Sequence, residues 1–338
     1  MKIDIFPHIF PRSFYERMLT VSEAASKYMQ RRVHDMPMLA DLEMRMRLMD
    51  QFPEYQQLLT AAGPGIETFC DPKISPELAR VANDGMAEIC TRYPDRFVGF
   101  AASLPMNNMD ACIQEVDRVI KHLGAKGVQI FTNVNGRPLD ELEFRPLFQK
   151  MAEYDRPIWL HPTRSSAFPD YLTEKKSKYE LWWAFGWPYE SSVAMARLVF
   201  TGIFDELPDL KIITHHLGAM IPYFERQIGP GLDHLGSRTP PSESDLYKCS
   251  LKHRPIDYFR KFYADTAVLG TGPLTCGLGF FGVEHVLFGT DMPFDHENGY
   301  FNVRETIRSI DAMPMSPSDR AKIYEINARQ LLSRISQK

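Results

Sequence analysis

The sequence alternates short β-rich runs with longer amphipathic stretches, and this alternation constrains the fold more than any other feature. Eight β-rich runs are expected to be strands, at residues 2–6, 55–60, 97–103, 127–131, 157–161, 211–215, 262–265 and 285–288. Stretches between them carry apolar residues three and four positions apart, as on one face of a helix, at 75–93, 109–123, 142–154 and 189–206. Such alternation is typical of βα units that form a parallel sheet.

Eight units in a chain of 338 residues predict one domain of the α/β class, a (β/α)8 or TIM barrel spanning residues 1–338. An open, doubly wound sheet is the alternative architecture. Two segments break the repeat: residues 15–51, rich in Met and Arg, and residues 229–256, rich in Pro, Gly, Ser and His. Both follow predicted strands, so we expect these insertions to cover the mouth of the barrel at the C-terminal ends of the strands.

The charge and cysteine content of the chain indicate which kinds of binding partner and which cellular compartment to expect. The chain has 39 Lys and Arg residues against 43 Asp and Glu residues, a net charge of -4, and it contains no run of basic residues. We therefore expect no nucleic acid partner. The five cysteines are widely spread and form no C-x-x-C pair, which is typical of a reducing compartment. No apolar stretch resembles a signal peptide or a spanning helix, so the sequence predicts a cytoplasmic protein without a membrane partner.

Polar side chains gather at the ends of several predicted strands. They are His8, His161, His215, His216 and Asp291. Because catalytic side chains of a barrel come from the C-terminal ends of its strands, we expect these groups to converge at the mouth. Imidazoles and a carboxylate are suitable ligands for a divalent metal such as zinc or manganese. A single histidine near a strand end is more often structural, but such residues on four different strands favour a site.

Long motifs give the chain a resemblance to a known family. They are ARVANDGMAEICTRYPDRFVGFAASLP, GAKGVQIFTNVNGRPLDELEFRPLFQKM, RPIWLHP, GWPYESSVAMARLVFTGIFDELPDLKIITHHLGAMIPYFER, FGTDMPF and EINARQLL. The chain resembles the amidohydrolase-related family that contains aminocarboxymuconate-semialdehyde decarboxylase and the γ-resorcylate and 2,3-dihydroxybenzoate decarboxylases. The resemblance spans almost the whole chain and implies a homodimer or homotetramer.

The resemblance implies a role for each residue near the mouth. His161 and Asp291 correspond to metal ligands of the family. The family's catalytic histidine stands six residues before the proline of the HHLGAMIP motif, which selects His216 as the catalytic neighbour of the metal. His215 is then expected to be a supporting or structural residue.

The first strand departs from the family pattern, which reads His-x-His or Glu-x-His. Here Phe6 stands at the first ligand position and His8 at the second. A phenyl ring cannot coordinate a cation, so either the metal remains on fewer ligands or the site has lost it. We predict a zinc or manganese ion on His8, His161 and Asp291, with Phe6 as an apolar floor of the substrate site.

The resemblance predicts a nonoxidative decarboxylase of a hydroxylated aromatic or related unsaturated carboxylic acid. In this reaction a metal holds the carboxylate and relieves developing charge, while Asp291, within reach of His216, donates the proton. A metal-dependent hydrolase that acts on a lactone, an amide or the C–C bond of a ring-cleavage product would use the same residues. A catalytically inactive barrel that acts as a binding subunit is the alternative of another class, favoured only by Phe6.

An aromatic segment, YELWWAFGWPYESS, lies between the fifth strand and its helix. Its residues Trp182, Trp183 and Trp187 are expected to form a wall that stacks on a planar ring. A packed lid or an oligomer contact is the alternative for this segment. Arg164 is a candidate cation for binding the substrate carboxylate.

Overall fold

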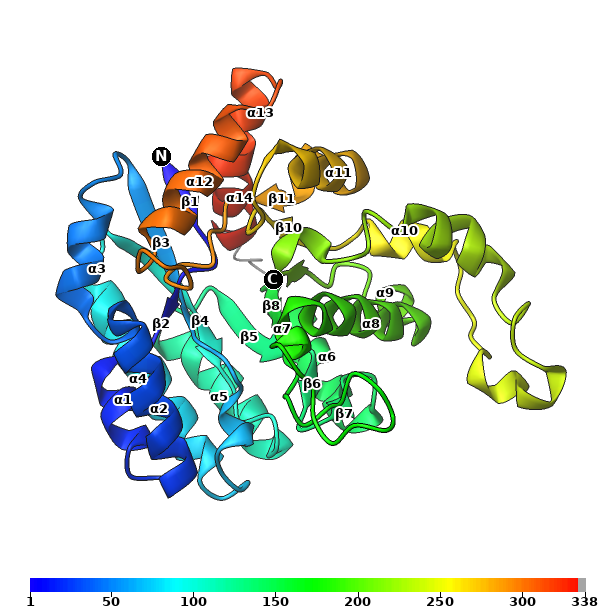
Figure 1. The fold of residues 1–338 in the computed structure, drawn as a ribbon, viewed down its shortest axis with the longest axis horizontal. Coiled ribbons are helices and arrows are strands. Elements are labelled where there is room, and N and C mark those ends of the chain that lie inside the picture. Colours follow the sequence, from blue (N-terminus) through cyan, green and yellow to red (C-terminus); the bar gives the residue numbers. More distant parts are fainter. Residues whose placement is uncertain (334–338) are drawn as a thin grey trace.

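The computed structural model describes residues 1–333 and contains the expected barrel of parallel strands surrounded by helices (Figure 1). The strands follow one another around the sheet in the order β1-β3-β4-β5-β8-β9-β10-β11. They are β1 Lys2–Asp4, β3 Tyr55–Ala61, β4 Phe97–Ser103, β5 Gly127–Phe131, β8 Ile158–His161, β9 Ile212–Thr214, β10 Tyr263–Asp265 and β11 Val286–Leu287. The prediction of an α/β barrel is confirmed.

The first and last strands meet through a backbone hydrogen bond, in which Ile5 N donates to the Phe288 carbonyl over 3.0 Å. The short strand β2 (His8–Ile9) continues the first strand and pairs with the end of β3, placing His8 opposite Thr60. His8 is thereby fixed at the C-terminal end of the barrel. A two-stranded hairpin, β6 (Asn133–Val134) and β7 (Arg137–Pro138), lies outside the barrel sheet.

Helices connect the strands. They are α1 Arg12–Met18, α2 Glu23–Asp35, α3 Leu42–Met49, α4 Ser75–Arg92, α5 Met109–His122, α6 Arg145–Glu153, α7 Leu181–Ala184, α8 Gly186–Phe200, α9 Ile203–Glu206, α10 Pro255–Phe259, α11 Thr271–Phe281, α12 Tyr300–Asp311, α13 Pro317–Ala321 and α14 Asn327–Ser333. None of those within residues 1–333 is both long and apolar enough to cross a membrane.

Helix α5 shows why these stretches become helices. The Asn108 side chain accepts a hydrogen bond from Ala111 N over 3.2 Å and so caps the first turn. Cys112, Val116 and Val119 follow at spacings of four and three residues and are fully buried. This spacing places them on one face of the helix, which packs against the sheet.

The inside of the barrel is filled by large apolar side chains. Phe6 and Trp159 are fully buried there together with Ile3, Ile5, Leu58, Ala101, Ile213 and Leu287. The indole Nε1 of Trp159 donates a hydrogen bond to the Ile5 carbonyl over 2.9 Å. The interior is therefore a packed core, and the groups available for chemistry lie above it.

Within the segment 15–51, helix α2 contacts residues at the C-terminal end of the barrel. The Tyr28 hydroxyl of α2 donates to the Gly63 carbonyl, at the end of β3, over 2.7 Å. Arg32, also on α2, lies 4.5 Å from the ring of Phe294, and this ring contacts the His8 ring at 5.3 Å between centroids. Helix α2 therefore lies next to the residues predicted to form the site.

The segment 229–256 does not cover the mouth, contrary to our expectation. Figure 1 shows it, in yellow, extending away from the side of the barrel. Lys252 N donates to Asp205 Oδ2 over 3.1 Å and so attaches the segment to α9, on the outside of the barrel. Within the segment, Arg254 pairs with Asp233 and joins its two ends.

Candidate functional site

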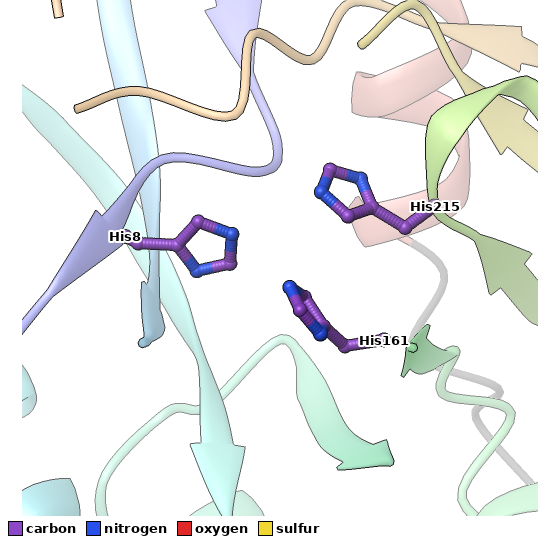
Figure 2. Close-up of side chains that lie close together, drawn as sticks. All are labelled: His8, His161 and His215. Carbon is purple, nitrogen blue, oxygen red and sulfur yellow. The ribbon is translucent and has the colours of Figure 1, made fainter. Parts of the chain in front are cut away.

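Three imidazoles converge at the C-terminal ends of the strands. His8 comes from β2, His161 ends β8 and His215 follows β9. All three are buried, and one ring nitrogen of each lies within 4.8 Å of the corresponding atoms of the other two. Figure 2 shows the three rings pointing toward a common centre.

Asp291, which follows β11, lies against this cluster. Its Oδ1 is 3.2 Å from His8 Nε2 and 3.4 Å from His215 Nε2, and its Oδ2 is 3.6 Å from His216 Nε2. The side chains of Asp291 and His216 are 22% and 23% exposed, whereas His8 and His215 are fully buried. A molecule that enters the site therefore meets Asp291 and His216 first.

The hydrogen bonds of the three buried histidines leave the same nitrogen free on each. His161 Nδ1 donates to the Pro162 carbonyl over 2.7 Å, and His215 Nδ1 donates to Asp265 Oδ2. The Thr60 hydroxyl donates its proton to the Pro7 carbonyl, so it accepts from His8 Nδ1 over 3.0 Å.

In each ring the Nε2 atom is therefore left to face the centre of the cluster. The Nε2 atoms of His8 and His215 are buried and have no hydrogen-bond partner among residues 1–333, a costly arrangement unless another group binds them. Lone pairs on neutral imidazoles together with a carboxylate are the donor set that a divalent transition metal prefers. The residues at this site fit such an ion.

The pKa values of the clustered side chains are shifted in different directions. Burial lowers the pKa of His8 and lowers the pKa of His161 well below its usual range, so both rings are held neutral. Burial opposes ionisation of Asp291, but its contacts with the imidazoles of His215, His216 and His8 outweigh burial and hold its pKa well below the usual range. Burial also opposes protonation of His215, but the charge of Asp265 raises its pKa to about 9.

Two residues of the cluster differ from the sequence analysis. His215, expected to be a supporting residue, points its Nε2 atom at Asp291 and into the cluster. Asp265, which holds the His215 ring, was not predicted as a site residue. Its signal was present in the sequence, since Asp265 ends the predicted strand 262–265 as His161 ends 157–161.

Phe6 packs behind the cluster and is not a floor open to substrate. Its ring stacks on His215 with 4.0 Å between centroids and an interplanar angle of 19°, and its side chain is fully buried among the barrel core. The expected substrate contact at Phe6 is therefore wrong, because the His215 ring covers one face of the phenyl group and the core surrounds it.

An aromatic wall flanks His161. The Trp187 ring meets the His161 ring edge-on at 5.6 Å, and Trp182 and Trp183 contact Trp187 at 5.8 and 6.3 Å. Trp183 is exposed and its Nε1 donates to Glu180, while Nε1 of Trp187 is buried and has no hydrogen-bond partner within residues 1–333. Of the three indoles, Trp187 is therefore the one that lies next to the imidazole cluster.

Arg164 has a partner of its own. Its guanidinium pairs with Glu190 over 2.7 Å and lies 5.1 Å from the ring of Phe168. The expected role of Arg164 as the cation for a substrate carboxylate is not supported by this geometry, because Glu190 already neutralises its charge.

The turn after β9 brings both neighbouring histidines to the site. His216 and Leu217 adopt left-handed backbone conformations, with φ of 54° and 53°, and Ala219 follows with φ of 56° and ψ of −117°. Side chains other than glycine rarely adopt these conformations, and they persist only where the surrounding structure enforces them. In a continuous strand, His215 and His216 would point to opposite faces. The turn interrupts the strand between them, so both side chains can lie near Asp291.

Comparisons with known proteins agree with this architecture. A γ-resorcylate decarboxylase from Rhizobium radiobacter is 33% identical over 311 residues, which cover 85% of each chain. The solved structure of a 2,6-dihydroxybenzoate decarboxylase complexed with 2,6-dihydroxybenzoate matches with a TM-score of 0.77 and 26% identity over 98% of this chain and 99% of that chain.

A 5-carboxyvanillate decarboxylase from Novosphingobium aromaticivorans DSM 12444 was solved with manganese and 4-hydroxy-3-methoxy-5-nitrobenzoic acid. It matches with a TM-score of 0.80 and 26% identity over 99% of this chain and 96% of that chain. The amidohydrolase family pattern itself matches residues 31–334. The chain belongs to the amidohydrolase family, as its sequence motifs predicted.

Proposed function

We propose that this protein is a metal-dependent, nonoxidative decarboxylase of a hydroxylated aromatic carboxylic acid. The observation that carries the proposal is the cluster of His8, His161 and His215 at the mouth of the barrel, with Asp291 lying against His8 and beside His216. This arrangement occurs in a chain that is similar, over most of its length, to several decarboxylases of such acids.

The residues proposed to hold the metal are His8, His161 and Asp291, and the manganese of the 5-carboxyvanillate decarboxylase structure supports a divalent ion here. When bound, such an ion would hold the substrate carboxylate and its neighbouring hydroxyl oxygen and offset the negative charge that develops. Zinc and manganese both accept imidazole and carboxylate ligands.

Asp291 and His216 are the proposed proton-transfer pair. Asp291 is ionised in the free protein because its imidazole neighbours hold its pKa well below the usual range, so it must receive a proton before it can donate one. His216 Nε2, 3.6 Å from Asp291 Oδ2, is placed to supply that proton. Both side chains are partly exposed and can reach a bound ring.

The reaction needs one proton and no oxidant. Electron donation from the ring hydroxyl lets the carboxylate-bearing carbon accept the proton from Asp291, forming a C–H bond. The bond to the carboxylate then breaks, its electron pair returns to the ring, and carbon dioxide leaves. The net change replaces a carboxylate by a hydrogen atom at one ring carbon.

The aromatic wall supports a planar substrate. Trp187, beside His161, presents an indole at the edge of the cluster, and its unpartnered Nε1 can donate a hydrogen bond to a substrate oxygen. Trp182 and Trp183 pack against Trp187 and so hold its ring. We propose that the substrate ring lies against Trp187 while its carboxylate faces the cluster.

A two-panel assay tests the reaction class. Purified protein loaded with Mn²⁺ or Zn²⁺ is incubated with hydroxylated benzoates and carbon dioxide release is measured, and in parallel with lactones, amides and ring-cleavage products while acid release is measured. The proposal expects turnover in the first panel. Activity in the second panel alone would instead establish a hydrolase.

A variant shows whether the measured activity comes from this protein, and not from a contaminating enzyme, and whether the barrel is catalytic or only binds a ligand. His216→Ala should lower carbon dioxide release by at least about 100-fold, as expected for loss of a proton-transfer group. Equal activity in His216→Ala and the unmodified protein would exclude the proposed proton-transfer pair.

A further inference from the structure

We propose that His215 is a fourth protein ligand of the metal and supplies the coordination that Phe6 cannot. This inference rests on the proposed function, in which the metal ligands are His8, His161 and Asp291. It adds a third imidazole to the two imidazoles and the carboxylate of that site, and substrate oxygens would take the further positions of an ion that accepts more than four ligands.

Two of the distances between donor atoms fit this set. An ion with bonds of about 2.0–2.2 Å holds adjacent ligand atoms about 2.8–3.6 Å apart, from octahedral to tetrahedral geometry. Asp291 Oδ1 lies 3.2 Å from His8 Nε2 and 3.4 Å from His215 Nε2. His161 completes the set, with a ring nitrogen within 4.8 Å of those of His8 and His215.

Asp265 fixes the direction of the His215 lone pair. Its Oδ2 accepts the Nδ1 proton of His215, so Nε2 is the nitrogen that faces the cluster. The other oxygen, Oδ1, accepts from Ala267 N over 2.8 Å, which orients the carboxylate, and Asp265 is fully buried. A carboxylate on the far nitrogen is the usual way in which proteins orient a metal-binding histidine.

Phe6 contributes by packing. Its ring lies parallel to the His215 imidazole at 4.0 Å and is itself enclosed by the barrel core. Gly289 allows this close arrangement, since a Cβ there would lie 2.8 Å from the Asp265 Cβ and 3.4 Å from the Phe6 Cβ. Phe6, Asp265 and Gly289 therefore hold the His215 ring from behind while its Nε2 faces Asp291.

His215 also has an unsatisfied requirement that an ion would meet. Its Nε2 is buried and has no hydrogen-bond partner in the described part of the chain, although Asp291 Oδ1 lies 3.4 Å away. A competing arrangement is a protonated His215 that lies between Asp265 and Asp291 and binds no ion. Removal of the imidazole lowers metal affinity if His215 is a ligand and does not lower it if His215 binds no ion. This difference can be measured without any substrate.

Metal affinity of the substrate-free protein tests the inference. Metal is removed from the full-length chain with a chelator, and MnCl2 or ZnCl2 is titrated in by calorimetry. We expect one ion per chain for the unmodified protein and a loss of at least about 100-fold in affinity for His215→Ala. Asp265→Asn should lose about 10–100-fold, the usual effect of removing the partner of a ligand.

His216→Ala is the matched control, because His216 is the next residue and also faces Asp291 but is not in the proposed ligand set. It should change affinity by less than about tenfold. His215→Gln, closer in size to histidine, serves if His215→Ala fails to give the circular dichroism spectrum of the metal-free protein, and it is expected to lose affinity as well.

The outcomes separate this inference from the proposed function. Equal affinity in His215→Ala or His215→Gln and the unmodified protein would overturn the fourth ligand while leaving a metal-dependent decarboxylase intact. Absence of metal binding in the unmodified protein would overturn both. A larger loss in His216→Ala than in His215→Ala would also overturn the inference, because the ligand would then be the neighbouring residue.

Discussion

Replacing Gly277 by alanine should destabilise the protein and disturb its site, because helix α11 packs tightly on the turn that carries His216. A Cβ at position 277 would lie 2.3 Å from both Cγ and Cδ2 of Leu217. Leu217 directly follows His216, is buried and has a left-handed backbone, so it has little freedom to move aside. The added methyl group must push the helix and the turn apart.

The same helix provides a matched control for the magnitude. Gly279 is exposed, and a Cβ there would meet no atom of the described residues 1–333 within 4 Å. Alanine in a helix is favoured over glycine by about 0.8–1.0 kcal/mol, so Gly279→Ala should be neutral or stabilising. Gly277→Ala gains the same helix preference but adds an overpacking cost of about 1–3 kcal/mol. The difference between the two variants is therefore about 1–3 kcal/mol in the free energy of unfolding.

Urea unfolding followed by circular dichroism measures this difference, and carbon dioxide release measures the effect on the site. Gly277→Ala should unfold at lower urea and lose activity, whereas Gly279→Ala should keep both. Two variants of equal stability would refute the claim that α11 holds the turn in place.

Three further predictions follow from the site and its surroundings. Burial raises the pKa of Glu67 from 4.5 to about 7. The protonated side chain therefore contributes stability below pH 4.5, and this contribution is lost as the pH rises to about 7. In urea unfolding, Glu67→Gln should stabilise the protein by up to about 3 kcal/mol at pH 8 but by only about 1 kcal/mol at pH 5. Chelation should abolish activity and lower the thermal midpoint, since an ion at 100 times its Kd contributes about 2.7 kcal/mol, and an unchanged midpoint would count against a bound ion. Trp187→Ala should raise KM about 3–10-fold, matching a ring contact of about 0.5–1.5 kcal/mol, and Trp187→Phe should retain most of the affinity; equal KM values for all three proteins would remove Trp187 from the substrate site.

Most of the barrel was predictable because its strands are short, buried and bounded by polar residues. The predicted runs 97–103 and 127–131 coincide with β4 and β5, and the predicted helix 75–93 differs from α4 by one residue. Segment 229–256 could not be placed in the same way. Its position depends on contacts with α9 on the outside of the barrel, which hydrophobic periodicity does not encode.

The site was predictable only in part, for a similar reason. His8, His161 and Asp291 were expected at the same end of the barrel because the C-terminal ends of parallel strands share one face, and the sequence order alone gives this placement. Both His215 and His216 were expected near the mouth, but the place of His215 inside the cluster could not be deduced, since strand alternation points only one of two neighbouring residues to a given face. The left-handed turn at His216 brings both rings to Asp291, and backbone strain of this kind is set by tertiary packing.

The central claim is that the protein replaces a ring carboxylate by hydrogen without an oxidant, and isotope labelling tests it most directly. The metal-loaded protein is incubated with its best hydroxybenzoate in deuterium oxide under anaerobic conditions, and the products are measured by mass spectrometry and NMR. We predict carbon dioxide and the decarboxylated phenol in equal amounts, with one deuterium at the carbon that carried the carboxylate. A requirement for oxygen, or product without deuterium at that carbon, would contradict the account.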